Sequence, residues 1–428
     1  MKRREFNGFL AALAGVASVA LSACGASTAG NRYQSRFLAA DSASLAQFNP
    51  ELRAFLQRDE FINAWGISIR PAGAGGHFWV TAGQYSFQFV GDVSAAPDPA
   101  LRRLFQDDLK LITLPGVGEG GFATGTVFNG APLDSRQFWI EGQPVQVDGV
   151  TRKLSGSARF LFATDGGVVS GWTERDPANP GRPLRRDGPA LAMIDDSANG
   201  AAFFGMAIRP DNWSTLWLAD FGRQPRLRQF NDQWQETALQ GFRNPFASGV
   251  AGQAAPGDYA PFNVQVLTLG GVPRVFVAYA KTQADAAQPG QFLAGEEDAL
   301  DAQQEGASPD RGKVVMYSLQ GELLRVFDDQ RLNAPWGMAI APEGFGALSG
   351  CLLVGNFGGS GRIAAYDVQS GRFYDWLRDA AGKPVAIPGL WGLQFGNGAS
   401  LGDSNALYFA AGPDDEKQGV FGALRYQD

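Results

Sequence analysis

The sequence is poor in the two residue types that nucleophilic enzymes and many metal sites use. Its 428 residues contain one histidine, His77, and two cysteines, Cys24 and Cys351. A single histidine nearly excludes a Ser-His-Asp triad and a His-rich metal site. We expect His77, at the start of a strand-like run, to be a loop histidine that is exposed or hydrogen-bonded. Phosphate-binding loops, GxGxxG fingerprints and CxxC pairs are also lacking in a supporting context.

Charge is scarce as well, and it is not basic. Charged residues make up 18% of the chain, with 36 Lys+Arg against 43 Asp+Glu, a net charge of −7 and a pI near 5.0. Nucleic-acid binding is read from a basic patch or stripe, so we expect no nucleic-acid partner. What is abundant is glycine, 56 residues, and aromatics, 12%. This balance is typical of many short strands joined by tight turns, and it favours an all-β fold.

The first 23 residues are expected to be a signal peptide. A basic start at residues 2–4 precedes an apolar run over residues 9–20, which is shorter than the roughly 20 residues needed to span a bilayer. Residues 21–24, Leu-Ser-Ala-Cys, resemble the bacterial lipobox, which implies cleavage before Cys24 and its acylation. Residues 3–6 resemble the twin-arginine export signature, and the general secretory route is the alternative.

The lipobox resemblance predicts a membrane partner and a cellular location. Acylated Cys24 would hold the protein on a membrane outside the cytoplasm, and Gly25 in place of aspartate favours the outer membrane, with the protein periplasmic or surface-exposed. Cys351 would then have no partner, so the sequence predicts no disulfide. It opens the apolar run 351–354, which predicts a buried strand residue.

One short phrase recurs six times: an aromatic residue, a glycine and then alternating apolar residues. Its anchor residues are 55 to 80 residues apart, and a four-stranded blade of about 40 to 50 residues fits each interval. We therefore predict a six-bladed β-propeller over residues 61–428. The six anchors are Gly66, Gly125, Gly205, Asn263, Gly337 and Gly392.

The phrase has a physical reason. Innermost strands crowd around the propeller axis, where a residue without Cβ allows close backbone approach. We expect the flanking tryptophan or phenylalanine to fill the wedge between neighbouring blades.

Residues 24–60 are expected to form a lipid-anchored linker, a ring-closing strand and a short helix. Only two or three strands follow Gly392, so residues 33–39 are predicted to supply the missing strand of the last blade. Residues 44–58 are rich in helix formers and predict a short amphipathic helix, broken at Pro50.

Five stretches together resemble a group of secreted bacterial propellers of unknown function that are related to the NHL-repeat and gluconolactonase-like propellers. They are residues 160–167, 259–265, 332–337, 353–358 and 410–416. The resemblance implies six blades and brings no reaction with it. The chain departs from the pattern after Val80, where Thr81-Ala82-Gly83 replaces the usual Ala-Asp-Asn-Gly.

Polar residues follow the second strand-like run of several repeats, and such positions converge near the axis on one face of a propeller. With Asn263 from the fourth phrase, the candidate ligand-binding residues are Asp165, Asp220, Asn263, Lys281, Asn356, Asp414, Asp415 and Glu416. Oxygen ligands of this kind suit Ca²⁺, and gluconolactonase-like propellers use such a site. The alternative is that they are turn residues that satisfy their own backbone.

Two functions remain open. One is a non-catalytic binding or scaffolding propeller on the cell envelope with a protein or carbohydrate ligand, favoured because no complete catalytic set is visible. The other is a Ca²⁺-assisted hydrolase or lyase that acts on a sugar, lactone or similar small molecule at the axial pocket.

Overall fold

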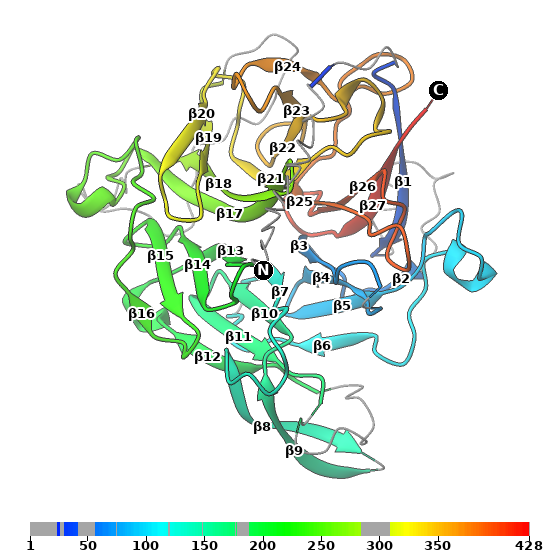
Figure 1. The fold of residues 1–428 in the computed structure, drawn as a ribbon, viewed down its shortest axis with the longest axis vertical. Helices are drawn as coiled ribbons and strands as arrows, with labels where there is room; N and C mark the ends of the chain where they lie inside the picture. Colours follow the sequence, from blue (N-terminus) through cyan, green and yellow to red (C-terminus); the bar gives the residue numbers. More distant parts are fainter. Residues whose placement is uncertain are drawn as a thin grey trace, which may run out of the picture.

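Six β-sheets surround a common axis in the computed structural model (Figure 1). The structure describes residues 24–25, 30–41, 56–73, 75–118, 120–147, 149–175, 177, 188–283 and 309–427. The only helices in these ranges are four short 3₁₀ turns. The predicted six-bladed β-propeller is confirmed. Of the predicted helix over residues 44–58, positions 44–55 lie outside the described ranges, and Leu56–Gln57 forms a short strand instead.

Each of the first five blades is a four-stranded antiparallel sheet. Blade one contains β3 (Ala64–Ser68), β4 (Phe78–Ala82), β5 (Tyr85–Phe89) and β6 (Leu111–Thr113). Blade two contains β7 (Ala123–Phe128), β10 (Phe160–Thr164), β11 (Val168–Trp172) and β12 (Leu191–Asp195). Blade three contains β13 (Phe203–Ile208), β14 (Thr215–Asp220), β15 (Arg226–Asn231) and β16 (Glu236–Thr237). Blade four contains β17 (Tyr259–Leu269), β18 (Val272–Lys281), β19 (Gly312–Tyr317) and β20 (Leu323–Phe327). Blade five contains β21 (Pro335–Ile340), β22 (Leu352–Asn356), β23 (Ile363–Tyr366) and β24 (Phe373–Trp376).

The two ends of the chain close the ring in blade six. Its inner strands are β25 (Leu390–Phe395), β26 (Ala406–Ala411) and β27 (Val420–Tyr426), and its outer strand is β1 (Tyr33–Ala40). β1 runs antiparallel to β27, from the pair Tyr33↔Tyr426 to the pair Ala40↔Val420. β2 (Leu56–Gln57) extends the sheet parallel to β1. The N-terminal segment therefore supplies the strand that the last blade lacks, as the strand count predicted.

The glycine of the repeated phrase allows each inner strand to contact the next one around the ring. A Cβ on Gly66 of blade one would lie 2.6 Å from the Thr124 carbonyl oxygen of blade two. A Cβ on Gly392 of blade six would overlap the Trp65 carbonyl oxygen of blade one. Both clashes involve backbone, which cannot move aside cheaply, so this crowding confirms the reason proposed for the glycines.

Blade four replaces this glycine with Asn263, and the replacement is structural. Its Nδ2 donates a hydrogen bond of 2.7 Å to the Trp336 carbonyl oxygen of blade five. Its Oδ1 accepts from the Val264 amide at 2.8 Å. Asn263 is 1% exposed, so it links two inner strands rather than facing a ligand.

The aromatic residues of the phrase fill the axis instead of the wedges between blades, so that expectation was wrong. Trp65 of blade one contacts Phe204 of blade three and Trp336 of blade five, with ring centroids 5.2 and 6.0 Å apart. It also stacks on Trp391 of blade six at 3.6 Å. Contacts between non-adjacent blades require these side chains to point inward, where they pack as one buried cluster.

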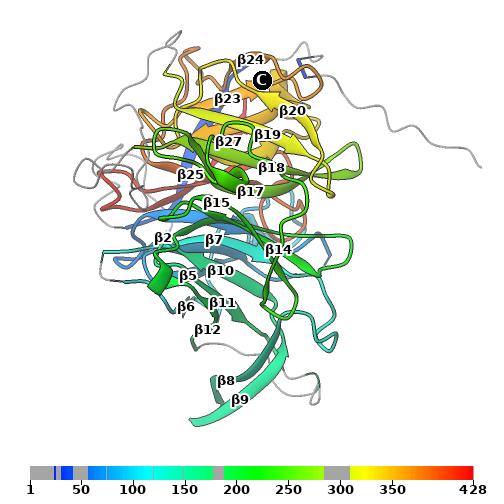
Figure 2. The same ribbon diagram turned by 90° about the vertical axis from the view of Figure 1, so that its left-hand side faces the viewer.

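An additional hairpin leaves the ring between the first and second strands of blade two. It consists of β8 (Trp139–Val147) and β9 (Val150–Ser157), and it projects from the edge of the molecule in both views (Figures 1 and 2). The interval between Gly125 and Gly205 is the longest between anchors because it contains this insertion, which the repeat pattern did not reveal.

The structure pairs the two cysteines, contrary to expectation. Cys24 and Cys351 form a disulfide, with Cα atoms 4.6 Å apart. Cys351 is buried immediately before β22, as predicted, and Cys24 packs against the same hydrophobic cluster. The sequence argument removed Cys24 as a partner by assigning it to acylation. In the folded chain the two residues are neighbours, so acylation and disulfide formation are alternative fates of the Cys24 sulfur.

Candidate functional site

An axial cavity of about 510 Å³ opens on the face where the second strands of the blades end. Its floor is aromatic, with Trp65, Phe204, Phe357 and Trp391. Its polar wall contains Asp165 of blade two and Glu416 of blade six, with Ser197 and Arg223 from blade three and its approach. Concave sites with an apolar floor and a few convergent polar groups are the usual form of small-molecule sites, and their volumes run from about 300 to 1,000 Å³.

Asp165 is held in the wall by a loop that precedes its own blade. Both of its carboxylate oxygens lie 2.9 Å from the Phe122 amide nitrogen, which donates to them. A Cβ on Gly121 would lie 2.8 Å from Oδ1, so the loop passes very close to the carboxylate. Burial raises the pKa of Asp165 to about 6, against the weaker lowering effect of its backbone hydrogen bonds.

Glu416 is tied to the aromatic floor through Asn63. The Asn63 Nδ2 donates to Glu416 Oε1 at 2.9 Å, while the Trp391 Nε1 donates to Asn63 Oδ1 at 2.8 Å. Burial raises the pKa of Glu416, and the nearby charge of Asp165 raises it further. The two carboxylates therefore interact electrostatically, although they come from blades two and six.

The turn that carries Glu416 has an unusual backbone. Asp414, Asp415 and Glu416 have φ angles of 56°, 50° and 63°, which place three consecutive non-glycine residues in the left-handed region. Each such residue costs about 1–2 kcal/mol relative to right-handed backbone. Asp414 and Asp415 are exposed, and Asp415 lies 3.6 Å from Lys417, so of the three acidic residues only Glu416 lines the cavity.

The remaining predicted site residues do not line the cavity. Asp220, 2% exposed, accepts from the amides of Ala202 and Gly222 and lies 3.2 Å from Arg228. Asn356, fully buried, accepts from the Asn333 amide and donates to the Arg362 carbonyl. Lys281 ends β18 with its Nζ 5.9 Å from the centre of the Tyr259 ring. The turn interpretation therefore describes Asp220 and Asn356, whereas Asp165 and Glu416 converge.

The described residues do not assemble a metal site from three or more His, Cys, Asp or Glu side chains. His77 does not line the axial cavity. Its Nε2 lies 3.0 Å from Asp107 Oδ2 within blade one. Asp165 and Glu416 are the two carboxylates in the lining of the cavity, and they offer at most four of the six to eight oxygen ligands that Ca²⁺ takes; the rest would have to be backbone carbonyls or waters.

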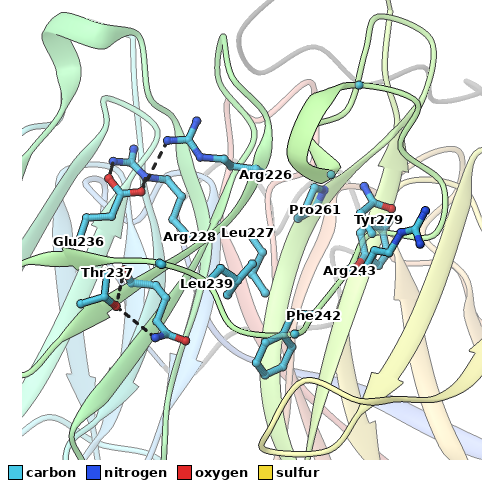
Figure 3. Close-up of a pocket in the computed structure, with 16 residues that line it drawn as sticks. Arg226, Leu227, Arg228, Glu236, Thr237, Leu239, Phe242, Arg243, Pro261 and Tyr279 are labelled. Carbon is cyan, nitrogen blue, oxygen red and sulfur yellow. Dashed lines mark hydrogen bonds and ion pairs between the residues drawn. The ribbon is translucent and has the colours of Figure 1, made fainter.

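A larger pocket, of about 640 Å³, lies between the outer strands of blade three and the inner strands of blade four (Figure 3). Arg226, Arg228 and Glu236 stand on one side of it, and Arg243 and Tyr279 on the other. Of the three arginines that line it, Arg228 is already neutralised, because it makes ion pairs of 2.6 Å with Glu236, 2.5 Å with Asp196 and 3.2 Å with Asp220. This pocket is therefore a poorer candidate for a charged ligand than the axial cavity.

The opposite end of the axis carries a third cavity of about 370 Å³, where the inner strands end. Ile67, Ile208 and Leu267 line it, together with Arg70, which forms an ion pair of 2.7 Å with Glu174. It shares no lining residue with the axial cavity. The aromatic cluster accordingly lies between two separate axial sites.

Sequence reasoning missed several residues of the cavity. Asn63, Ser197, Arg223 and Phe357 were not proposed as site residues, and Trp65 and Trp391 were interpreted as structural. Phe357 had a usable signal, since it directly follows a second strand, as the predicted polar residues do. Ser197 and Arg223 lie in connections whose paths the sequence does not reveal.

Comparisons with known proteins add little to the functional argument. No protein-family profile matches the chain. The uncharacterised protein R648 of Acanthamoeba polyphaga mimivirus is 27% identical over 85% of this chain and 75% of its own length. The uncharacterised protein L690 of the same virus is 30% identical over 49% of both chains.

Solved structures with detectable similarity are distant. BamB of Moraxella catarrhalis is 11% identical, with a TM-score of 0.34 over 85% of this chain and 83% of its own. A gluconolactonase of Xanthomonas campestris is 14% identical, with a TM-score of 0.33 over 70% of this chain and 87% of its own.

Within the described ranges, no helix combines the length and hydropathy required to cross a bilayer.

Proposed function

We propose that this chain is an exported β-propeller that binds a small ligand in the axial cavity without transforming it. The observation that carries the proposal is the convergence of Asp165 and Glu416, from blades two and six, above an aromatic floor. The strained turn under Glu416 supports it, because strain of this kind clusters at functional sites. A binding role is preferred to catalysis because a complete set of nucleophile, base and oxyanion donors is not identified around the cavity.

Export is part of the proposal and rests on the N-terminal sequence. A signal peptide ahead of Cys24 would deliver the propeller outside the cytoplasm, where a disulfide such as Cys24–Cys351 persists. We propose that Cys24 carries lipid in an envelope-anchored form, in which Cys351 would be a free thiol. Intact mass under non-reducing conditions distinguishes the two fates. A lipid adduct supports the anchor, and the loss of two hydrogen atoms on an unmodified mature chain contradicts it.

The binding proposal is tested by blocking the cavity from its exposed edge. Ser197 lines the cavity and is exposed, so Ser197→Trp adds bulk at the mouth without disturbing the core. The neighbouring Ala198 is exposed and does not line the cavity, so Ala198→Trp is the matched control.

Ligand-observed NMR with a library of sugars, lactones, amines and amino acids is the assay. We expect at least one compound to bind the wild type and Ala198→Trp but not Ser197→Trp. A library in which no compound distinguishes the two tryptophan variants would refute the proposed function.

A further inference from the structure

The charge state of the axial cavity points to the class of its ligand. Three of the four buried carboxylates among the described residues, on Asp92, Asp220 and Glu174, have an arginine within 3.2 Å. The half-buried Asp165 and Glu416 have none among the described residues; Asp165 accepts hydrogen bonds from backbone amides, that of Phe122 among them, and Glu416 accepts one from the Asn63 side chain. Charges shielded from water are normally paired with an opposite charge. The two carboxylates of the cavity depart from this rule, because neither is paired with a cation among the described residues.

Arg223 does not supply that charge. It lines the cavity but is exposed, and it makes no ion pair with either carboxylate. At the rim its charge is screened by solvent and salt, and it leaves an excess of negative charge in the cavity.

The floor favours an organic cation over a bare metal ion. Trp65, Trp391 and Phe357 form a continuous stack, with centroid distances of 3.6 Å and 3.9 Å on the two sides of Trp391. Aromatic ring faces attract ammonium groups. Trp65 and Phe357 cover both faces of Trp391, so only the outer rings of the stack can offer a face to a cation. Two carboxylates above such a floor suit a compact organic cation, whereas Ca²⁺ would need several more oxygen ligands.

The floor also keeps hydrogen-bonding capacity of its own. Trp65 lines the cavity and is 3% exposed, and its indole Nε1 has no acceptor among the described residues. A buried donor without an acceptor is uncommon in folded proteins, and it points to an accepting group on the ligand, such as a hydroxyl, beside the ammonium.

We propose that the axial cavity binds an organic ammonium ion, held between Asp165 and Glu416 above the tryptophan floor. This inference rests on the proposed function, since it names the ligand class of the same cavity. It requires both carboxylates in the ionised form. Burial raises the pKa of Asp165 to about 6 and also raises the pKa of Glu416, so binding weakens as the pH falls through the pKa of Asp165.

The test uses choline chloride as the probe and 3,3-dimethylbutan-1-ol, its uncharged isostere, as the matched control ligand. Isothermal titration is performed with the wild type, Asp165→Asn and Glu416→Gln, and with Asp134→Asn, which changes an exposed carboxylate outside the cavity lining. We expect choline to bind the wild type and Asp134→Asn equally, at least ten-fold more weakly to either cavity variant, and more weakly at pH 5 than at pH 7.5. The uncharged alcohol should not bind.

Other outcomes separate this inference from the proposed function. If glucose or the uncharged alcohol binds and Ser197→Trp abolishes that binding, the cavity is a ligand site and the ammonium inference is wrong. If Ca²⁺ binds and both cavity variants abolish that binding, the cavity is a Ca²⁺ site and the ammonium inference is wrong. If choline binding is absent or insensitive to both cavity variants, the inference fails. If no ligand is sensitive to Ser197→Trp, the proposed function fails as well.

Discussion

Asp165 should lower the stability of the folded protein, and removing its charge should raise it. Its pKa is raised from 3.8 to about 6 in the folded chain, because burial disfavours the ionised form. A carboxyl with a raised folded-state pKa holds its proton more tightly when folded, so stability is lost as the pH rises through that pKa. Asp165→Asn is neutral at every pH and escapes this loss, while its Oδ1 still accepts from the Phe122 amide.

The size of the effect follows from the two pKa values. With one pKa unit worth about 1.4 kcal/mol, the ionised carboxylate costs about 3 kcal/mol at pH 8 and about half of that at pH 5. Asp165→Asn should therefore be more stable than the wild type at both values, with an advantage about twice as large at pH 8. The full 3 kcal/mol is an upper bound, because Asp165 is only partly shielded from water.

Urea unfolding at pH 5 and pH 8, followed by tryptophan fluorescence, measures this difference. Asp134→Asn, an exposed carboxylate, should show no pH-dependent advantage. If Asp165→Asn is less stable than the wild type, and to the same extent at both pH values, then Asp165 stabilises the fold and the prediction is wrong. A residue that lowers stability in the free protein is a common sign of a binding role.

Three further predictions concern the ring. Gly392→Ala should destabilise the protein by about 1–3 kcal/mol, because the new Cβ overlaps the Trp65 carbonyl. Gly118→Ala, with open space around it, should be neutral in the same urea assay, and equal effects of the two substitutions would contradict crowding at Gly392. Asn263→Ala should lose about 1–3 kcal/mol, since it leaves the buried Trp336 carbonyl without its partner; an unchanged midpoint of unfolding would show that this link is dispensable. Cys351→Ala should lower the melting temperature of the disulfide-bonded form under non-reducing conditions but change it much less with reductant; similar shifts in both conditions would indicate that only the packing of Cys351 matters.

The repeat pattern predicted the ring well because it reports local physics. Alternating apolar runs and the crowded glycine depend on neighbours within one blade or the next, so Gly66 and Gly392 were interpreted correctly. The closing strand followed from counting. The axial direction of Trp65 was missed, because an aromatic side chain beside a glycine has two places to pack and the phrase does not distinguish them.

The site was only partly predictable for a related reason. Asp165, Asp220 and Asn356 hold similar positions at the ends of second strands, and the sequence treats them alike. Asp220 is neutralised by Arg228, eight residues further along the chain, whereas the cavity carboxylates have no arginine partner in the part of the chain that the structure describes. The left-handed turn that places Glu416 is visible only in the backbone. The disulfide was missed because acylation of Cys24 was assumed before the fold was known.

The most direct test is a crystal structure of the protein soaked with choline. We expect an ordered ligand in the axial cavity, with its ammonium group between the carboxylates of Asp165 and Glu416 and against the aromatic floor. An empty axial cavity, or choline bound instead in the pocket beside Arg228 and Tyr279, would contradict it.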